Sequence, residues 1–189
     1  MIENPPLIQI KKIKQENKPS LEQLALFHNV PTGFICDALE GYAALNGNIK
    51  LLDVSDKKLH VVGSALTVQS GAADVLGMQI VLNEIKTNDI IINTVNGWQD
   101  TASVGDSVIG MIKNNGGKAI VTDGPIRDYN GVIETKVPCF CTGINPKSPY
   151  NSGPAKIGFP IIIGGMPVKS GDIIVGDIDG VTVVPFERI

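Results

Sequence analysis

The middle of the chain alternates between strand-like and helix-like hydrophobic patterns, and this alternation restricts the folds open to it. Apolar, β-branched runs at 59–68, 89–95 and 118–122 predict buried strands, while residues 72–85 and 104–115 between them have helical spacing. The units recur at a spacing of about 25 residues, which is typical of α/β folds with a partly parallel sheet. We therefore expect an α/β protein.

Two short helices are expected before this region. Ser20 and Gln23 have the spacing of a capping box, which predicts a helix through about residue 27. A second helix over 32–39 is expected to end at Gly41, because glycine commonly closes a helix.

The last third of the chain changes to short strands separated by glycine turns. Strands are expected at 137–141, 160–163, 166–168, 172–175 and 181–185. With the middle region they predict a compact single domain of mixed sheets with flanking helices over 20–189, preceded by an N-terminal arm at 1–19.

Composition excludes several classes of protein. A chain of 189 residues with net charge −3 fits one globular domain, and its only basic run is Lys11-Lys12-Ile13-Lys14, so a nucleic-acid surface is not expected. It has no apolar run long enough to span a membrane. The three cysteines are an odd number, which favours free thiols in a reducing cytoplasm.

Two segments resemble metal motifs but have simpler interpretations. Cys139 and Cys141 lie two apart in a predicted strand, and no further ligands are evident beside them. Asp177-Ile178-Asp179-Gly180 starts like a calcium loop but lacks the third acidic position and the distal glutamate of that motif. We therefore expect buried thiols at the first segment and a turn at the second.

A candidate anion site begins at Ser103-Val104-Gly105-Asp106, which looks like an N-cap followed by the first turn of a helix. The first turn carries free N–H groups and positive potential, so the amides of Gly105, Asp106, Ser107 and Val108 could hold a carboxylate. Alternatively, Asp106 only completes a capping box with Ser103, and this segment alone favours that interpretation.

A second candidate segment is Thr122-Asp123-Gly124-Pro125-Ile126-Arg127-Asp128. Arg127 and Asp128 could form an ordinary surface ion pair, which contributes little. Their place after a strand and a Gly-Pro turn favours a ligand site, whereas Asp123 is better explained by the turn. An arginine beside a carboxylate suits an anionic substrate held against a divalent cation, so we expect a metal-dependent enzyme acting on a small 2-oxo acid.

Several motifs, taken in order, resemble one known family. It is that of the class II 4-hydroxy-4-methyl-2-oxoglutarate aldolases and the related regulator of ribonuclease activity A-like proteins. The similarity covers about residues 20–185. The segments that carry it are 63–68, Gly97, 102–106, 123–128, 138–140, 164–172 and 176–181.

This resemblance implies a compact α/β/β swivelling fold in homotrimers or in hexamers of two trimers, with active sites between subunits. It also implies magnesium or manganese, cleavage of 4-hydroxy-2-oxo acids to pyruvate through an enolate, and in several members decarboxylation of oxaloacetate. Asp128 matches the metal-ligand aspartate, and Arg127 matches the arginine that stabilises the enolate. Gly105 to Val108 match the carboxylate-binding amides, and Asp106 matches an aspartate that orients a water at the metal.

Two rival interpretations stay open. The ribonuclease-regulator branch implies a non-catalytic protein-binding module, but its members tend to lack an aspartate after the arginine, so Asp128 favours an enzyme. A binding protein without turnover is the third interpretation. Aldolases of the family also continue into an acidic C-terminal segment that reaches the neighbouring site, and Glu187 near the end of this sequence is not assigned that role.

Overall fold

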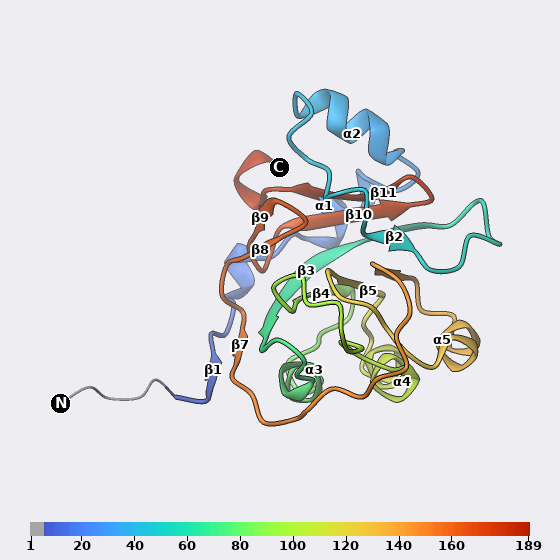
Figure 1. The fold of residues 1–189 in the computed structure, drawn as a ribbon. Coiled ribbons are helices and arrows are strands. Elements are labelled where there is room, and N and C mark those ends of the chain that lie inside the picture. Colours follow the sequence, from blue (N-terminus) through green and yellow to red (C-terminus); the bar gives the residue numbers. More distant parts are fainter. Residues whose placement is uncertain (1–5) are drawn as a thin grey trace.

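The alternating middle of the chain forms a parallel sheet at the centre of the molecule (Figure 1). The computed structural model describes residues 6–189. Four strands lie side by side and parallel, in the order β3 (His60–Ser70), β4 (Asp89–Thr94), β5 (Ala119–Thr122) and β6 (Cys139–Cys141). The predicted α/β class is confirmed.

β3 is long enough to pair with two different strands along its other edge. Its first half pairs antiparallel with β10 (Ile173–Asp177), and its last residues pair antiparallel with β7 (Ala155–Ile157). The remaining strands of this sheet are β1 (Ile8–Ile10) beside β7, β2 (Lys50–Leu51) beside β6 and β11 (Gly180–Val184) beside β10. A separate hairpin pairs β8 (Ile161–Ile163) with β9 (Met166–Val168).

Three helices cover one face of the parallel strands, as Figure 1 shows: α3 (Leu76–Val81), α4 (Asp106–Asn114) and α5 (Tyr129–Thr135). Their buried side chains, among them Met78, Ile109 and Val132, pack on the strands in one apolar cluster. Strands β8 to β11 contribute to a second cluster with the opposite face of the sheet. The helices α1 (Leu21–Ala25) and α2 (Thr32–Ala38) pack outside β10 and β11. The result is the predicted mixed α/β/β layering.

Several local predictions are confirmed. Ser20 and Gln23 form both hydrogen bonds of the capping box at the start of α1. Gly41 has a φ of +81° just after α2, and its N–H donates to Cys36 O. The turn before Gly180 joins β10 to β11, and the Asp177 carboxylate accepts from Thr32 and from Asp179 N–H. That aspartate therefore serves the turn, as expected.

Other predictions were wrong or incomplete. The helix expected over 72–85 is limited to α3. It begins late because Ala73 has a φ of +56°, and the Asp74 carboxylate accepts from Leu76 N–H at the start of α3 as well as from Ser152 N–H. The strands β1, β2 and β7 and the helix α5 were not expected. Within residues 6–189, no helix combines the length and apolar character that crossing a bilayer requires. Cys139 and Cys141 are buried free thiols, and Cys36 is a half-buried one.

Candidate functional site

The two candidate segments lie together in one cavity of about 470 Å³. Gly105 to Val108 come from the start of α4, and Arg127 and Asp128 come from the segment that links β5 to α5. All six predicted site residues therefore line the same space. The other lining residues are Val75, Gln79, Val104 and 148–151.

Backbone hydrogen bonds hold these two segments against each other. Ser103 N–H donates to Pro125 O at 2.7 Å, and Arg127 N–H donates to Val104 O at 3.1 Å. Val104 and Ile126 form a parallel bridge and are both fully buried. The start of α4 and the Arg127-Asp128 pair are thus fixed relative to each other by the backbone itself.

Helix α4 begins two residues later than the capping-box alternative required, at Asp106. Gly105 is the N-cap, and it makes no side-chain cap. The Ser103 hydroxyl instead donates to Pro125 O inside the protein, at 3.0 Å. The prediction of Ser103 as N-cap was therefore wrong, and the first N–H groups of α4 donate no hydrogen bond to its side chain. Amides of this kind are the groups that bind a carboxylate at a helix N-terminus.

Arg127 and Asp128 form an ion pair at the mouth of the cavity. Arg127 Nε donates to Asp128 Oδ2 at 3.1 Å, and Arg127 Nη1 donates to Ser148 Oγ at 2.5 Å. Their side chains are 37% and 42% exposed, so both remain within reach of a ligand from solvent. Asp128 has a φ of +60° and a ψ of 45° at the start of α5, and this left-handed conformation directs it away from the helix.

The absence of a side chain at Gly105 is what permits this arrangement. A Cβ at that position would lie 2.5 Å from Asp128 Oδ2 and 3.1 Å from Arg127 Nε. Its backbone, with a φ of −128°, is open to any residue, so only this close approach requires glycine.

The Asp106 carboxylate lines the cavity and is held by its neighbour Ser107. Its Oδ1 accepts hydrogen bonds from the N–H of Ser107, at 2.5 Å, and from the Ser107 hydroxyl, at 3.1 Å. A Cβ at Gly131 of α5 would collide with Asp106 Oδ2, so the carboxylate packs directly over that glycine. Asp106 thus lies between α4 and α5.

Comparison with known proteins places the chain in a family. The model of the RraA-like family, described as Aldolase/RraA, matches residues 32–183. The chain belongs to this family.

Some relatives of the chain are named as aldolases and others as inhibitors of RNA processing. A protein of Halalkalibacterium halodurans named "Putative 4-hydroxy-4-methyl-2-oxoglutarate aldolase" is 37% identical, over 89% of this chain and 79% of the relative. Streptomyces coelicolor RraAS2, described as an unusual member of the RNase ES inhibitor RraA family, is 30% identical with a TM-score of 0.79, covering 90% of this chain and 89% of that one. RraA from Thermus thermophilis, described as an RNA-processing inhibitor, shares the fold, with 20% identity, a TM-score of 0.74 and coverage of 83% and 93%.

Sequence reasoning missed the wall formed by residues 148–151. Asp74, 3% exposed, anchors the end of this segment, because its Oδ2 accepts from Ser152 N–H at 2.7 Å and Gly153 N–H at 2.9 Å. Tyr150 is fixed as well, by hydrogen bonds of its backbone to Ala73 and Val75. No local pattern indicates this wall, since its partners are far away in the sequence.

Asp123, which the sequence assigned to a turn, has a structural role. Its carboxylate accepts from Thr94 Oγ1 and Val95 N–H, each at 2.7 Å, and from Gly97 N–H at 3.1 Å. These bonds tie the loop after β4 to the end of β5. Asp123 does not line the cavity of Arg127 and Asp128.

The donor set of the cavity fits a hard divalent cation. Asp106 and Asp128, which carry carboxylates, and Gln79, which carries an amide, all line the cavity. Between residues 6 and 189, no three His, Cys, Asp or Glu side chains cluster as a complete protein cage. Mg²⁺ is commonly held by one or two carboxylates, with water and substrate oxygens completing its shell, so such a cage is not required.

Proposed function

We propose that the chain is a divalent-metal-dependent lyase that releases pyruvate from 4-hydroxy-2-oxo acids, with oxaloacetate decarboxylation as a side activity. The observation that carries this proposal is the shared cavity of the α4 amides, Arg127 and Asp128. Membership of the RraA-like family and the aldolase name of the Halalkalibacterium relative support it.

The protein groups have separable roles in this reaction. The N–H groups at the start of α4, from Gly105 to Val108, would bind the substrate carboxylate. The Ser107 N–H already donates to Asp106 Oδ1, so the substrate would share or replace that acceptor there. Arg127 would neutralise the negative charge that develops on the 2-oxo oxygen as the carbon–carbon bond breaks, and charge stabilisation of this kind is commonly the largest catalytic contribution. Asp106 would orient a water that carries a proton to the product carbon.

Asp128 is the proposed ligand of the cation, Mg²⁺ or Mn²⁺. When bound, the cation would supply Lewis-acid polarisation of the 2-oxo group. Among residues 6–189, Asp128 Oδ1 makes no hydrogen bond, whereas Oδ2 accepts from Arg127. Asp128 therefore has an oxygen available for the cation while it positions the arginine.

We further propose a cytoplasmic homotrimer, or a hexamer of two trimers, as the resemblance implies. The side chains of Arg127 and Asp128 are partly exposed, which is consistent with a site completed by a neighbouring subunit. Size-exclusion chromatography with light scattering would test this assembly, and a monomer at micromolar concentration would contradict it.

The alternative function is a non-catalytic regulator of a ribonuclease. The similarity to Streptomyces coelicolor RraAS2 is the observation in its favour. Co-purification with a nuclease, together with no turnover, would support this alternative.

The deciding experiment is a coupled lactate dehydrogenase assay for pyruvate. Oxaloacetate and 4-hydroxy-4-methyl-2-oxoglutarate are each tested with Mg²⁺, with Mn²⁺ and with chelator. Metal-dependent release is expected, and the preferred substrate separates aldolase from decarboxylase. No release from either substrate would overturn the proposal.

The variant Arg127→Ala tests the assigned role of the arginine in the same assay. We expect a loss of about 3 kcal/mol in transition-state stabilisation, seen mainly in kcat. A loss confined to KM would make Arg127 a binding residue only.

A further inference from the structure

A second cavity, of about 320 Å³, lies between the N-terminal segment and the body of the protein. It is formed by residues 10–24 together with β3 and the start of β4, and it shares no residue with the cavity of Arg127. It opens at the amino-terminal end of β4, whereas the Arg127 cavity follows the carboxyl end of β5. It is therefore a separate candidate site.

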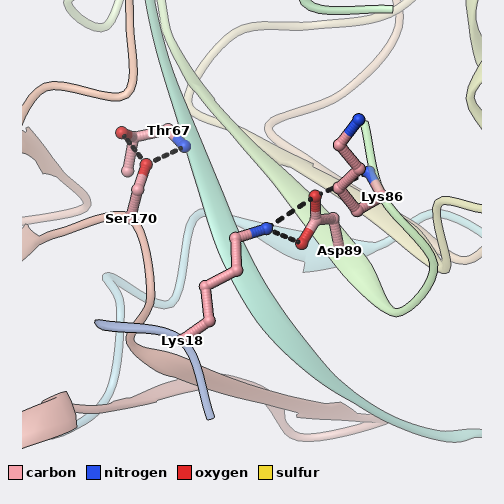
Figure 2. A network of polar contacts seen from close by, with 5 residues as sticks. All are labelled: Lys18, Thr67, Lys86, Asp89 and Ser170. Carbon is pink, nitrogen blue, oxygen red and sulfur yellow. Dashed lines mark hydrogen bonds and ion pairs between the residues drawn. The ribbon is translucent and has the colours of Figure 1, made fainter. Parts of the chain in front are cut away.

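Two residues that line this cavity, Lys18 and Asp89, form a buried ion pair, which Figure 2 shows. Lys18 Nζ donates to Asp89 Oδ1 at 2.9 Å and to Oδ2 at 3.2 Å, and the two side chains are 13% and 2% exposed. Asp89 also accepts from the backbone N–H of Lys86 at 2.8 Å. Burial raises the pKa of the Asp89 carboxyl, although Lys18 opposes this shift.

Lys18 has donor capacity left over. A lysine ammonium carries three N–H donors, and within residues 6–189 Lys18 Nζ contacts only the Asp89 carboxylate. Lys18 and Asp89 both line the cavity, and the two Asp89 oxygens already accept hydrogen bonds from Lys18 Nζ and Lys86 N–H. The cavity is therefore lined by an ammonium group with an unused donor.

Ser64 supplies a second, unused donor beside this ion pair. Ser64 of β3 is the register partner of Asp89 in β4, so their side chains lie on the same face of the sheet. Ser64 lines the cavity, and its hydroxyl oxygen is buried without a hydrogen-bond partner within residues 6–189. A buried hydroxyl without a partner is costly, and a bound ligand would provide the missing acceptor.

Charge around the cavity favours an anionic ligand. Four lysines line it, Lys11, Lys12, Lys18 and Lys86, against two acidic residues, Glu84 and Asp89. Lys11, Lys12 and Lys86 are exposed and form no ion pair within residues 6–189, whereas Asp89 is already paired with Lys18. Lysine is a common ligand of phosphate and carboxylate oxygens.

We propose that this cavity binds a small oxyanion, a phosphate or a carboxylate, whose oxygens accept hydrogen bonds from Lys18 Nζ and Ser64 Oγ. The exposed lysines at the mouth supply further positive charge. The ligand would join the N-terminal segment, through Lys18, to β3, through Ser64. Its binding would consequently stabilise the attachment of residues 10–24 to the sheet.

The test is isothermal titration calorimetry of the full chain with inorganic phosphate and, separately, with malonate, at constant ionic strength. Saturable binding of at least one of the two is expected, and the preferred anion identifies the ligand class. Binding should weaken about fivefold or more in Ser64→Ala, because the hydroxyl contact is lost. Ser64→Ala removes a hydroxyl without a protein partner, so the fold should be retained.

Two control variants show whether the anion binds at this cavity and not elsewhere on the protein. Thr101→Val removes the other buried hydroxyl that lacks a partner within residues 6–189, outside the cavity, and should bind as the wild type does. Because the Arg127 cavity is itself proposed to bind carboxylates, Arg127→Ala removes any anion bound there, whereas the binding that Ser64→Ala weakens should persist in Arg127→Ala. The proposal is overturned if neither anion saturates, if Ser64→Ala binds with wild-type affinity, or if Arg127→Ala abolishes binding.

Discussion

Arg127 Nη1 donates to Ser148 Oγ, and this contact links the proposed catalytic arginine to a wall that the sequence did not indicate. Asp128 holds the same guanidinium through Nε, so two neighbours fix its orientation. Ser148 belongs to the wall of residues 148–151. The chain just after this wall is anchored by the buried Asp74 carboxylate, which accepts from the N–H groups of residues 152 and 153. A side chain held in this way needs little reorganisation when charge develops on a substrate.

Replacement of Ser148 tests whether this orientation matters. Ser148→Ala removes one hydrogen bond to the guanidinium, so kcat/KM for pyruvate release should fall by about fivefold, equivalent to about 1 kcal/mol. Ser152→Ala is the matched control, because it lies in the same exposed segment and contributes only its backbone N–H to Asp74. Equal losses in both variants would show that the Ser148 contact has no special role.

Gly105, the N-cap of α4, and Gly110, inside α4, offer a second matched pair of substitutions. Gly105→Ala would place a Cβ 2.5 Å from Asp128 Oδ2, so we expect activity to fall by about a hundredfold or more. Gly110→Ala meets only Thr135, at 3.9 Å, and should stabilise the helix by up to about 1 kcal/mol with normal activity. Steady-state kinetics and thermal unfolding of both variants check this, and a fully active Gly105→Ala would contradict the tight approach.

Features with local causes were predictable from the sequence. The strands β3, β4 and β5 have continuous apolar runs, and the capping box of Ser20 and Gln23 needs only four residues. Gly105 was predicted from the start of a helix, and Arg127 and Asp128 from their place after a strand and a Gly-Pro turn; the three line one cavity. The prediction that Ser103 is an N-cap was wrong. A serine shortly before a glycine and an aspartate resembles an N-cap, but the Ser103 hydroxyl donates to Pro125 O in the core.

The remaining features depend on distant partners. β1 and β7 have three residues each and pair with one another from opposite ends of the chain. Helix α5 contains an asparagine and a glycine, both poor helix formers, and buries only Val132. The wall at 148–151 depends on Asp74 and Arg127. The N-terminal arm at 1–19 stays a prediction. One of its residues, Lys18, forms an ion pair with Asp89 of the sheet.

Asp128 can be tested without disturbing the backbone. Asparagine tolerates the left-handed conformation at this position, whereas alanine would add strain of about 1 kcal/mol. Asp128→Asn should therefore unfold at the wild-type temperature but lose metal-dependent turnover and Mn²⁺ binding measured by calorimetry. Wild-type turnover in Asp128→Asn would show that this carboxylate does not hold the cation.

Asp172 gives a prediction about the pH dependence of stability. Its buried carboxylate accepts from Lys169 N–H and Phe186 N–H, but burial outweighs these bonds and raises the pKa of the carboxyl above 3.8. An acid with a raised pKa binds its proton more tightly when folded. Its contribution to stability is thus complete below 3.8 and is lost as the pH rises through the folded-state pKa.

The variant Asp172→Asn removes this titration and isolates its effect. The free energy of unfolding of the wild type, minus that of Asp172→Asn, should increase as the pH falls from 7 toward about 4, measured by urea unfolding. Asp53→Asn is a control of opposite sign, because hydrogen bonds from Ser55 lower the pKa of the Asp53 carboxyl. For Asp53 the same difference should shrink slightly as the pH falls. The opposite result would be a wild-type minus Asp172→Asn difference in the free energy of unfolding that shrinks as the pH falls. It would mean that the hydrogen bonds of the Asp172 carboxylate outweigh its burial, so that the carboxylate stabilises the link between β10 and the C-terminal residues at neutral pH.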